Sequence, residues 1–302
     1  MEKAYIILAH KNIEQLNRLL QRLDDNASFF FIHIDKKLSV DEMPALSKIP
    51  DRIYMVKRIN THWAGLSLVR ATLLGMKAIK ATQREFHTIT LLSGQDYPVK
   101  CNEDINTFFK NADRRIMMEY FKVPNFDKWS PRGGMYRLDK YYFGLKFHQR
   151  YIAKAMNFVV NIFPFLKRKQ PGNLKPYGGS QWWTMNMDAL NYILRYVKDN
   201  PSYLIFHKST FAPDELFFQT ILLNAKDETI CNSIVNNNKR FIRWDGMSMS
   251  HPALLQKDDF RDLIASDDLF ARKLDLSKHP EIFDLIDKNC LNKDGDSVRL
   301  LL

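Results

Sequence analysis

Cysteine is scarce in this sequence of 302 residues: the three cysteines lie far apart and none belongs to a CxxC spacing. The sequence therefore indicates neither a disulfide framework nor a zinc site, and a reducing compartment is the simplest inference. Long hydrophobic runs are also missing. The apolar run over residues 4–9 is too short for a secretory core or a membrane span. We expect no signal peptide or transmembrane segment, and a chain that begins directly with folded structure.

Several common catalytic and binding motifs are absent as well. There is no GxGxxG after the first expected strand, no GxxxxGK[ST], no HExxH and no GxSxG. Dinucleotide-binding, P-loop, zinc-protease and serine-hydrolase functions therefore lose their usual sequence support. No DxD-type pair of acids follows a strand in the first half to hold a divalent metal on a diphosphate. A nucleotide diphosphate bound here would need cations of the protein instead.

Acidic residues are outnumbered, with 34 Asp and Glu against 45 Lys and Arg, which gives a net charge of +11. This charge indicates an anionic partner: a nucleic acid, a phosphorylated small molecule or an acidic membrane surface. No helix-turn-helix, RNP or zinc-finger pattern supports nucleic-acid binding, so we expect no nucleic-acid partner. A hydrophobic content of 45% is typical of a globular protein.

The first part of the chain alternates apolar runs with segments of helical periodicity. These patterns predict strands over residues 4–9, 29–34, 52–56, 87–94 and 116–121, and helices over residues 12–23 and 67–82, the second capped by Ser67. Such an α/β pattern predicts a mainly parallel sheet with helices on both faces. Ligands of such sheets bind beyond the carboxyl ends of the strands.

The second part of the chain is less regular. Long loops are expected after residue 123, followed by a strand within 179–186, a strand over 240–244, and helices over 188–198, 214–224 and 258–266. The segment 151–170 combines an apolar helix, interrupted at Pro164, with a basic tail. We interpret it as a core helix that ends in solvated lysines; the alternative is a surface segment that enters an anionic membrane.

Acidic residues at three expected element ends are candidates for chemistry. Asp35 follows the second strand in FIHIDKK and either accepts hydrogen bonds from a ribose or base, or belongs to a solvated loop. Asp96 in LLSGQDYP either contacts a ligand or orders its turn. Asp214 and Glu215 in FAPDELFFQT either cap a helix or include a proton acceptor.

Taken together, the motifs resemble one known family in order and approximate spacing over about residues 4–275. The segments that carry the resemblance are AYIILAHKN, FIHIDKK, THWAGLSLVRATL, LLSGQDYP, GSQWWTMN, PDELFFQT, RFIRW and LFARKLD. They are similar to the core-2/I-branching β-1,6-N-acetylglucosaminyltransferases, a family that also includes the peptide xylosyltransferases. The resemblance implies a GT-A-type, Rossmann-like fold in a single large domain over 1–302, with a donor-nucleotide half at about 1–122 and an acceptor half at about 123–302.

The resemblance also implies an inverting transfer from a nucleotide sugar without a metal ion. Glu215 matches the catalytic base of the family, and Asp214 keeps the capping role. Lys273, with Arg272 beside it, matches the cations that hold the diphosphate of the leaving group. The branching enzymes carry a further arginine where this chain has residues 248–252, so that part of the phosphate clamp differs.

Other residues are assigned by their places in the same motifs. Trp244 matches a tryptophan that packs on the acceptor sugar, and Glu119 matches an acceptor-binding glutamate. Trp182 is expected at the wall of the site, partly in the core, as is Trp183. The remaining residues expected on the donor side are His10, Asp35 and Asp96.

The expected function is transfer of N-acetylglucosamine or xylose from a UDP-sugar to a glycan or lipid-linked glycan, with no metal cofactor. The resemblance implies that animal relatives are anchored in the Golgi by an N-terminal span, which we do not expect in this chain. We therefore expect a bacterial protein that acts in the cytoplasm, peripherally at an anionic membrane surface. Two alternatives stay open: a sugar- or nucleotide-binding protein without catalysis on the same scaffold, and a basic nucleic-acid binder.

Overall fold

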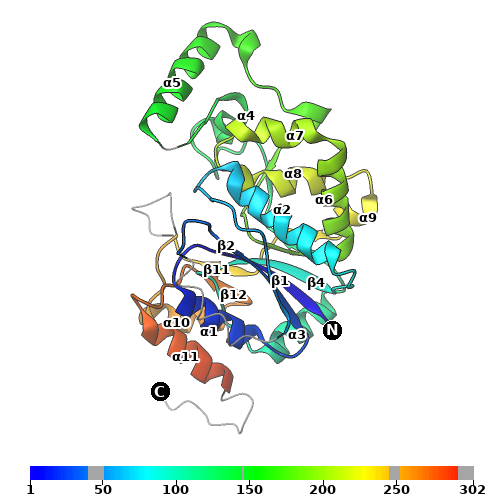
Figure 1. Cartoon of the computed structure of the whole chain (residues 1–302), viewed down its shortest axis with the longest axis vertical. Helices are drawn as coiled ribbons and strands as arrows, with labels where there is room; N and C mark the ends of the chain where they lie inside the picture. Colours follow the sequence, from blue (N-terminus) through cyan, green and yellow to red (C-terminus); the bar gives the residue numbers. More distant parts are fainter. Residues whose placement is uncertain (40–50, 145, 245–251, 292–302) are drawn as a thin grey trace. The chain divides into compact units, whose positions relative to one another are not determined.

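The computed structural model describes residues 1–39, 51–144, 146–244 and 252–291. Within these ranges the chain forms two compact units, each assembled from segments that are separate in sequence. The first unit takes its described residues from 1–55, 86–114 and 239–291, and the second takes them from 56–85 and 115–238. Figure 1 follows the chain through both units by colour.

The first unit is built on parallel strands. Strand β1 (Lys3–Ala9) lies between β2 (Ser28–Ile34) and β4 (Thr88–Ser93), and β3 (Ile53–Met55) pairs with β2. All residues of β1, β2 and β4 are buried. Burial on both faces explains why these strands are continuous apolar runs rather than alternating patterns.

A smaller sheet completes the strands of the first unit. Strand β12 (Phe270–Arg272) runs parallel to β11 (Arg240–Ile242) and antiparallel to β5 (Tyr97–Pro98). The helical elements of this unit are α1 (Ile13–Leu23), α3 (Asn102–Asn111), η8 (Lys257–Asp259), α10 (Phe260–Ala265) and α11 (Pro280–Leu291).

Helix α1 forms where its sequence predicts it. The side chain of Asn12 caps it, with Oδ1 accepting a hydrogen bond from the backbone N of Gln15 at 3.0 Å. The leucines of α1 recur at helical spacing and are buried in the core of the unit. They share that core with Tyr97 and Phe283, whose rings meet edge to face with centroids 4.8 Å apart.

The second unit contains short strands. Strand β6 (Ile116–Met118) pairs in parallel with β10 (Ile234–Val235) and antiparallel with β9 (Trp183–Met185), while β7 (Phe121–Lys122) and β8 (Tyr177–Gly178) form an antiparallel pair. Its α-helices are α2 (Leu66–Ala81), α4 (Tyr136–Asp139), α5 (Phe147–Ile162), α6 (Met187–Asp199), α7 (Pro201–Phe206), α8 (Phe217–Leu223) and α9 (Glu228–Asn232). Its short 3-10 turns are η3 (Arg132–Gly134), η4 (Pro164–Leu166), η5 (Pro171–Asn173), η6 (His207–Ser209) and η7 (Pro213–Glu215).

The predicted α/β class with a mainly parallel sheet is confirmed by β1 to β4 and the helices between them. The single-domain organisation and its division near residue 122 stay predictions. In the ranges that the structure describes, no helix has both the length and the apolar content that a bilayer crossing requires.

Predictions at Ser67 and in two segments of the chain are wrong. Ser67 does not cap α2, because the helix begins at Leu66 and the Ser67 hydroxyl accepts a hydrogen bond from the backbone N of His62 at 2.8 Å. The strand expected over 116–121 divides into β6 and β7. The core-helix interpretation of segment 151–170 also fails, since only Ala153 and Val160 of α5 are buried.

Because Phe283 is fully buried in the first unit, we expect Phe283→Ala to lower the free energy of unfolding by about 3–5 kcal/mol. The lost ring leaves a cavity beside Tyr97. Urea denaturation followed by circular dichroism measures the change. Phe126→Ala is the matched control: its ring is 74% exposed, and its effect should stay within about 0.5 kcal/mol. Equal effects of the two substitutions would contradict the assigned core.

Candidate active site

In the first unit, polar side chains gather where the parallel strands end. His10 follows β1 and Asp35 follows β2. Asp35 is buried, and its Oδ1 accepts a hydrogen bond from the backbone N of Lys37 at 2.8 Å. Partial burial lowers the pKa of His10, the charges of Lys11 and Lys273 lower it further, and Asp35 opposes them. These side chains therefore share one electrostatic environment at the carboxyl edge of the sheet.

Asp96 lies in the turn after β4 and is fully buried. Its Oδ2 accepts a hydrogen bond from the backbone N of Ser93 at 2.5 Å, and its Oδ1 pairs with Nη1 of Arg272 at 2.8 Å. The turn-ordering interpretation of Asp96 is therefore supported by the geometry. The same carboxylate also fixes the guanidinium of Arg272 on β12.

Arg272, Lys273 and Lys11 form a group of cations in this part of the unit. Burial lowers the pKa of Arg272 and Asp96 opposes the change. Burial likewise lowers the pKa of Lys273, and the neighbouring charges of Arg272 and Lys11 add to that decrease. The positive charges around Lys273 are stabilised when an anion binds beside them. The charge of this part of the unit is therefore suited to an anion.

Arg240 is a further buried cation of this unit. Its Nη2 donates to the backbone O of Leu91 at 3.2 Å, and its guanidinium lies 4.5 Å from the ring centroid of Phe270. Burial lowers its pKa to about 10, while the charge of Asp96 raises it. Arg240 thus adds positive charge beneath the end of β4.

Gln15 holds together the loops that carry these residues. Its Nε2 donates to the backbone O of Gly94 at 2.8 Å and to that of Leu274 at 3.2 Å. Its Oε1 accepts from the backbone N of Leu276 at 2.8 Å. One buried amide therefore joins α1, the turn after β4 and the segment that follows Lys273.

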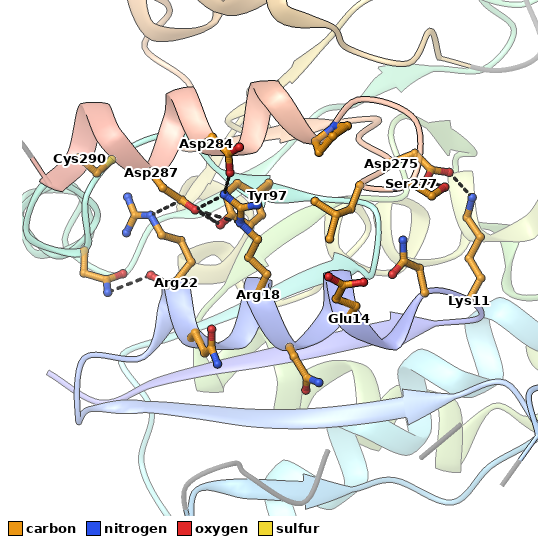
Figure 2. Close-up of a pocket in the computed structure, with 16 residues that line it drawn as sticks. Lys11, Glu14, Arg18, Arg22, Tyr97, Asp275, Ser277, Asp284, Asp287 and Cys290 are labelled. Carbon is orange, nitrogen blue, oxygen red and sulfur yellow. Dashed lines mark hydrogen bonds and ion pairs between the residues drawn. The ribbon is translucent and has the colours of Figure 1, made fainter. Parts of the chain in front are cut away.

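A cleft of about 1080 Å³ lies on the first unit between α1 and α11, with Lys11 and Asp275 among its lining residues (Figure 2). Its charged groups pair with one another: Arg18 contacts Asp284 at 2.6 Å and Asp287 at 2.8 Å, and the Tyr97 hydroxyl donates to Asp287 at 2.8 Å. None of the predicted donor-side residues lines this cleft. We therefore assign these side chains to the packing of α11 on α1.

The second unit contains Glu215, at the end of the 3-10 turn η7. Its Oε2 accepts a hydrogen bond from Nη1 of Arg137 at 2.6 Å. The Arg137 side chain is 8% exposed and that of Glu215 36% exposed. The guanidinium also lies 3.7 Å from the ring centroid of Trp129. The carboxylate is therefore oriented from its buried side and reaches solvent on the other.

The backbone around Glu215 depends on close contacts. The backbone N of Gly179 donates to the carbonyl of Glu215 at 3.0 Å. A Cβ at Gly179 would lie 1.9 Å from the carbonyl O of Glu119, so only glycine lets these two segments of the chain approach. Ala212, just before η7, adopts φ 46° and donates its backbone N to the carbonyl of Ala64 at 2.9 Å. The position of Glu215 is therefore set by these contacts and not by the start of a regular helix.

Asp214 does not have the capping role that its position suggested. Helix α8 begins at Phe217, later than predicted, and neither η7 nor α8 has a side-chain cap. Asp214 is buried, and its Oδ1 has no hydrogen-bond partner in the described part of the chain. Burial raises the pKa of Asp214 to about 7, and the adjacent charge of Glu215 raises it in the same direction.

The residues expected on the acceptor side are distributed over both units. Glu119 lies in the second unit, with Oε1 3.9 Å from Nζ of Lys128. Trp182 and Trp183 are both buried there, and Trp183 packs edge to face on Phe218. Trp244 follows β11 in the first unit and is 57% exposed.

The described geometry therefore gives two groups of predicted residues. His10, Asp35, Asp96, Arg272 and Lys273 lie together in the first unit, and Glu215 and Glu119 belong to the second. Positions 248–251, where the branching enzymes carry their further arginine, lie outside the described residues. Among the described residues, no three His, Cys, Asp or Glu side chains are grouped as metal ligands.

Comparison with known proteins assigns the family. The model of the family described as Core-2/I-Branching enzyme matches residues 3–264, which is most of the chain. This chain belongs to the Core-2/I-Branching enzyme family. The resemblance carried by the sequence motifs is thus confirmed.

Relatives of this Core-2/I-Branching family member include xylosyltransferase 2 of Rattus norvegicus, 26% identical over 307 residues that cover 94% of this chain and 33% of the relative. N-acetyllactosaminide β-1,6-N-acetylglucosaminyl-transferase of Mus musculus is 23% identical, over 92% of this chain and 69% of its own length. The chain spans about a third of the length of the xylosyltransferases it matches. Among solved structures, mouse xyloside xylosyltransferase 1 in its apo form is 10% identical with a TM-score of 0.34, over 90% of this chain and 97% of the other.

Sequence reasoning missed the residues that position the site. Arg137 stands in an irregular loop-rich segment and has no motif of its own, so its pairing with Glu215 depends on tertiary structure alone. Gln15 lies on the buried face of α1, where a polar residue among leucines was the available signal. Arg240 begins the RFIRW motif. An arginine on a predicted strand indicates a buried charge, and a buried charge requires a hydrogen-bond or ion-pair partner.

The raised pKa of Asp214 makes protein stability depend on pH. Between about pH 4 and pH 7 the folded protein keeps this proton while the unfolded chain loses it, so the stability due to the neutral acid is present at low pH and is lost as pH rises through about 7. Asp214→Asn keeps a neutral group at every pH. We expect the free energy of unfolding of the variant, relative to the parent, to rise by roughly 1–4 kcal/mol from about pH 5 to about pH 8.

Urea unfolding at the two pH values measures this difference. Asp51→Asn, at an exposed turn, is the matched control and should show no such trend. A constant difference between Asp214→Asn and the parent across this range would show that Asp214 is ionised in the folded protein.

Proposed function

We propose that this protein is a glycosyltransferase that moves N-acetylglucosamine or xylose from a UDP-sugar to a hydroxyl of a glycan acceptor. The family match over residues 3–264 carries this proposal. The relatives support it, because they are a xylosyltransferase and a β-1,6-N-acetylglucosaminyl-transferase. The GT-A-type fold and a donor half near residues 1–122 are part of the same proposal.

Glu215 is the proposed general base. In an inverting transfer, an acceptor oxygen attacks the anomeric carbon from the face opposite the nucleotide. The hydroxyl proton passes to the carboxylate, and the bond from the anomeric carbon to the diphosphate oxygen breaks, with its electrons leaving on UDP. Arg137 occupies Oε2 of Glu215 at 2.6 Å, which leaves Oε1 for the acceptor hydroxyl. General-base assistance of this kind accelerates a reaction by about 10²–10⁴.

The cations of the first unit are the proposed binding site of the diphosphate. The departing UDP gains negative charge as the bond breaks, and fixed positive groups stabilise that charge. Arg272 is held in place by Asp96, so its guanidinium is preorganised, whereas Lys273 has the more mobile stem. We propose that these side chains do the work of a metal ion, with His10 and Asp35 contacting other parts of the donor.

Trp244 and Glu119 are the proposed acceptor contacts. The indole of Trp244 is 57% exposed, and its flat face suits the C–H face of a pyranose. The net charge of +11 supports a site of action at the anionic inner face of a membrane, on a lipid-linked or growing surface glycan. The buried Trp182 contributes to this site as packing beneath its wall.

The base is tested with Glu215→Gln. We expect this variant to lose about 10²–10⁴ in kcat for release of UDP with an acceptor present, because the amide cannot take the proton. EDTA should leave the parent's rate unchanged. Glu228→Gln, an exposed glutamate on α9 of the same unit, is the matched control and should retain full activity. Retained turnover in Glu215→Gln, or loss of the parent's activity on chelation, would contradict the mechanism.

The diphosphate site is tested by calorimetry with UDP. Lys273→Ala should weaken the Kd of UDP by roughly tenfold to a hundredfold, since a hydrogen bond to a charged group contributes about 1.5–3 kcal/mol. Lys257→Ala, at an exposed lysine of the same unit, is the control and should bind as the parent does. Tight UDP binding by the parent without transfer or donor hydrolysis would favour the non-catalytic alternative.

A further inference from the structure

Helix α5 packs on the second unit through a narrow face. Ala153 and Val160 are its buried residues. Asn157 bonds the backbone of Tyr141 twice, donating from Nδ2 to the carbonyl O and accepting at Oδ1 from the N, each at 2.8 Å. Figure 1 shows α5 at the periphery of this unit, beyond α4 and α7.

The opposite face of α5 is apolar and faces solvent. Phe147, Tyr151, Phe158 and Ile162 follow one another at intervals of 4, 7 and 4 residues, which places them on one side of a helix. Their exposed fractions are 76%, 61%, 65% and 55%. A soluble surface helix normally has the reverse arrangement, with its apolar side buried. This surface therefore needs a partner.

The apolar surface continues into the next turn. Phe163, Phe165 and Leu166, in and beside η4, are 47%, 76% and 42% exposed. We call α5 and η4 together the docking segment.

The docking segment lies in a stretch of the chain with one sign of charge. Between Asp139 and Asp188 the sequence has no acidic residue and eight basic ones: Lys140, Lys146, Arg150, Lys154, Lys167, Arg168, Lys169 and Lys175. Lys146, Arg150, Lys154, Lys167 and Lys169 are exposed. Exposed aromatics flanked by lysines and arginines are the chemical features of a helix that lies in the interface of an anionic bilayer.

We propose that the docking segment binds the surface of an anionic lipid bilayer. The aromatic side chains enter the boundary between headgroups and acyl chains, about 5–10 Å deep, and the basic side chains contact lipid phosphates. A second copy of the chain is a poorer partner, because pairing two such segments would bring like charges together. The absence of acidic residues over this whole stretch matches a lipid surface of uniform negative charge.

Arg168 connects the docking segment to the part of the unit that holds Glu215. Its Nη1 donates to the carbonyls of Lys140 and Ser209, each at 2.7 Å, and its Nη2 donates to Oγ1 of Thr210 at 2.9 Å. Lys140 directly follows α4, the helix that carries Arg137. Docking would therefore hold the Arg137–Glu215 pair at a set distance from the bilayer. This last consequence rests on the proposed function; lipid binding itself does not.

Co-sedimentation of the full chain with vesicles tests the proposal. We expect binding to vesicles that contain phosphatidylglycerol, weaker binding to pure phosphatidylcholine, and release by salt. Replacing Phe147 and Phe158 together by Ser should reduce partitioning about tenfold or more, because two large apolar groups no longer enter the interface. The matched control replaces Phe126 and Ile205 by Ser, two exposed apolar residues outside the segment, and should bind as the parent does.

Charge reversal tests the electrostatic part. Lys167→Glu with Lys169→Glu should reduce binding roughly tenfold, while Lys77→Glu with Lys226→Glu, at exposed lysines elsewhere in the unit, should reduce it much less. Thermal unfolding of each variant checks that the fold is kept. Glu215→Gln should bind vesicles normally, which separates failure of this inference from failure of the proposed chemistry.

Insertion is measured with Phe158→Trp and lipids brominated in their acyl chains. The bromines should quench more fluorescence in this variant than in the parent, whereas Phe126→Trp should show no added quenching. Three results would overturn the proposal: equal affinity for neutral and anionic vesicles, equal effects of the segment and control variants, or no added quenching at position 158. A parent dimer that becomes monomeric in the Phe147 and Phe158 double variant would instead assign the surface to a second copy.

Discussion

The contact between Arg137 and Glu215 is the interaction on which the chemistry that we propose for the second unit depends. A carboxylate that is to accept a proton must be held in position and still be reachable, and here the guanidinium fixes Oε2 from the protein side. Arg137 is in turn fixed by the face of Trp129 at 3.7 Å. Because the arginine is buried, its loss would leave the acid mobile, and loss of the acid would leave a buried charge unpaired.

The first unit meets a different constraint, which is to keep cations close together before any anion arrives. Arg272 pairs with the buried Asp96 and Lys11 pairs with Asp275, and the charges of Arg272 and Lys11 lower the pKa of Lys273. The remaining repulsion between these cations would be relieved by the diphosphate that we propose as their ligand. Gln15 and the parallel strands provide the rigid support that this requires, since they tie the loops to the core of the unit.

The sequence predicted best what local patterns determine. The buried strands β1, β2 and β4 are continuous apolar runs, and α1 combines helical periodicity with an Asn cap, so each was found within a residue or two. The strand ends then indicated where His10, Asp35 and Asp96 would meet.

What the sequence could not predict depends on contacts between distant segments. The helix expected from Asp214 begins instead at Phe217, because the close approach at Gly179 and the turn at Ala212 hold the preceding residues in a 3-10 turn. Segment 151–170 was assigned to the core from its apolar content, yet composition does not reveal which face of a helix meets the protein. The role of Arg137 follows from its hydrogen bond to Glu215, which lies 78 positions later in the chain.

The packing around Trp129 limits how this protein can be redesigned. A Cβ on Gly134 would lie 2.3 Å from the indole, and one on Gly178 would lie 2.4 Å from it. No larger residue fits at either glycine without displacing the Trp129 ring. A displaced ring would also displace Arg137, which lies against its face. Libraries that vary the surroundings of Glu215 should keep Trp129 and both glycines constant and place their diversity at exposed neighbours such as Lys128.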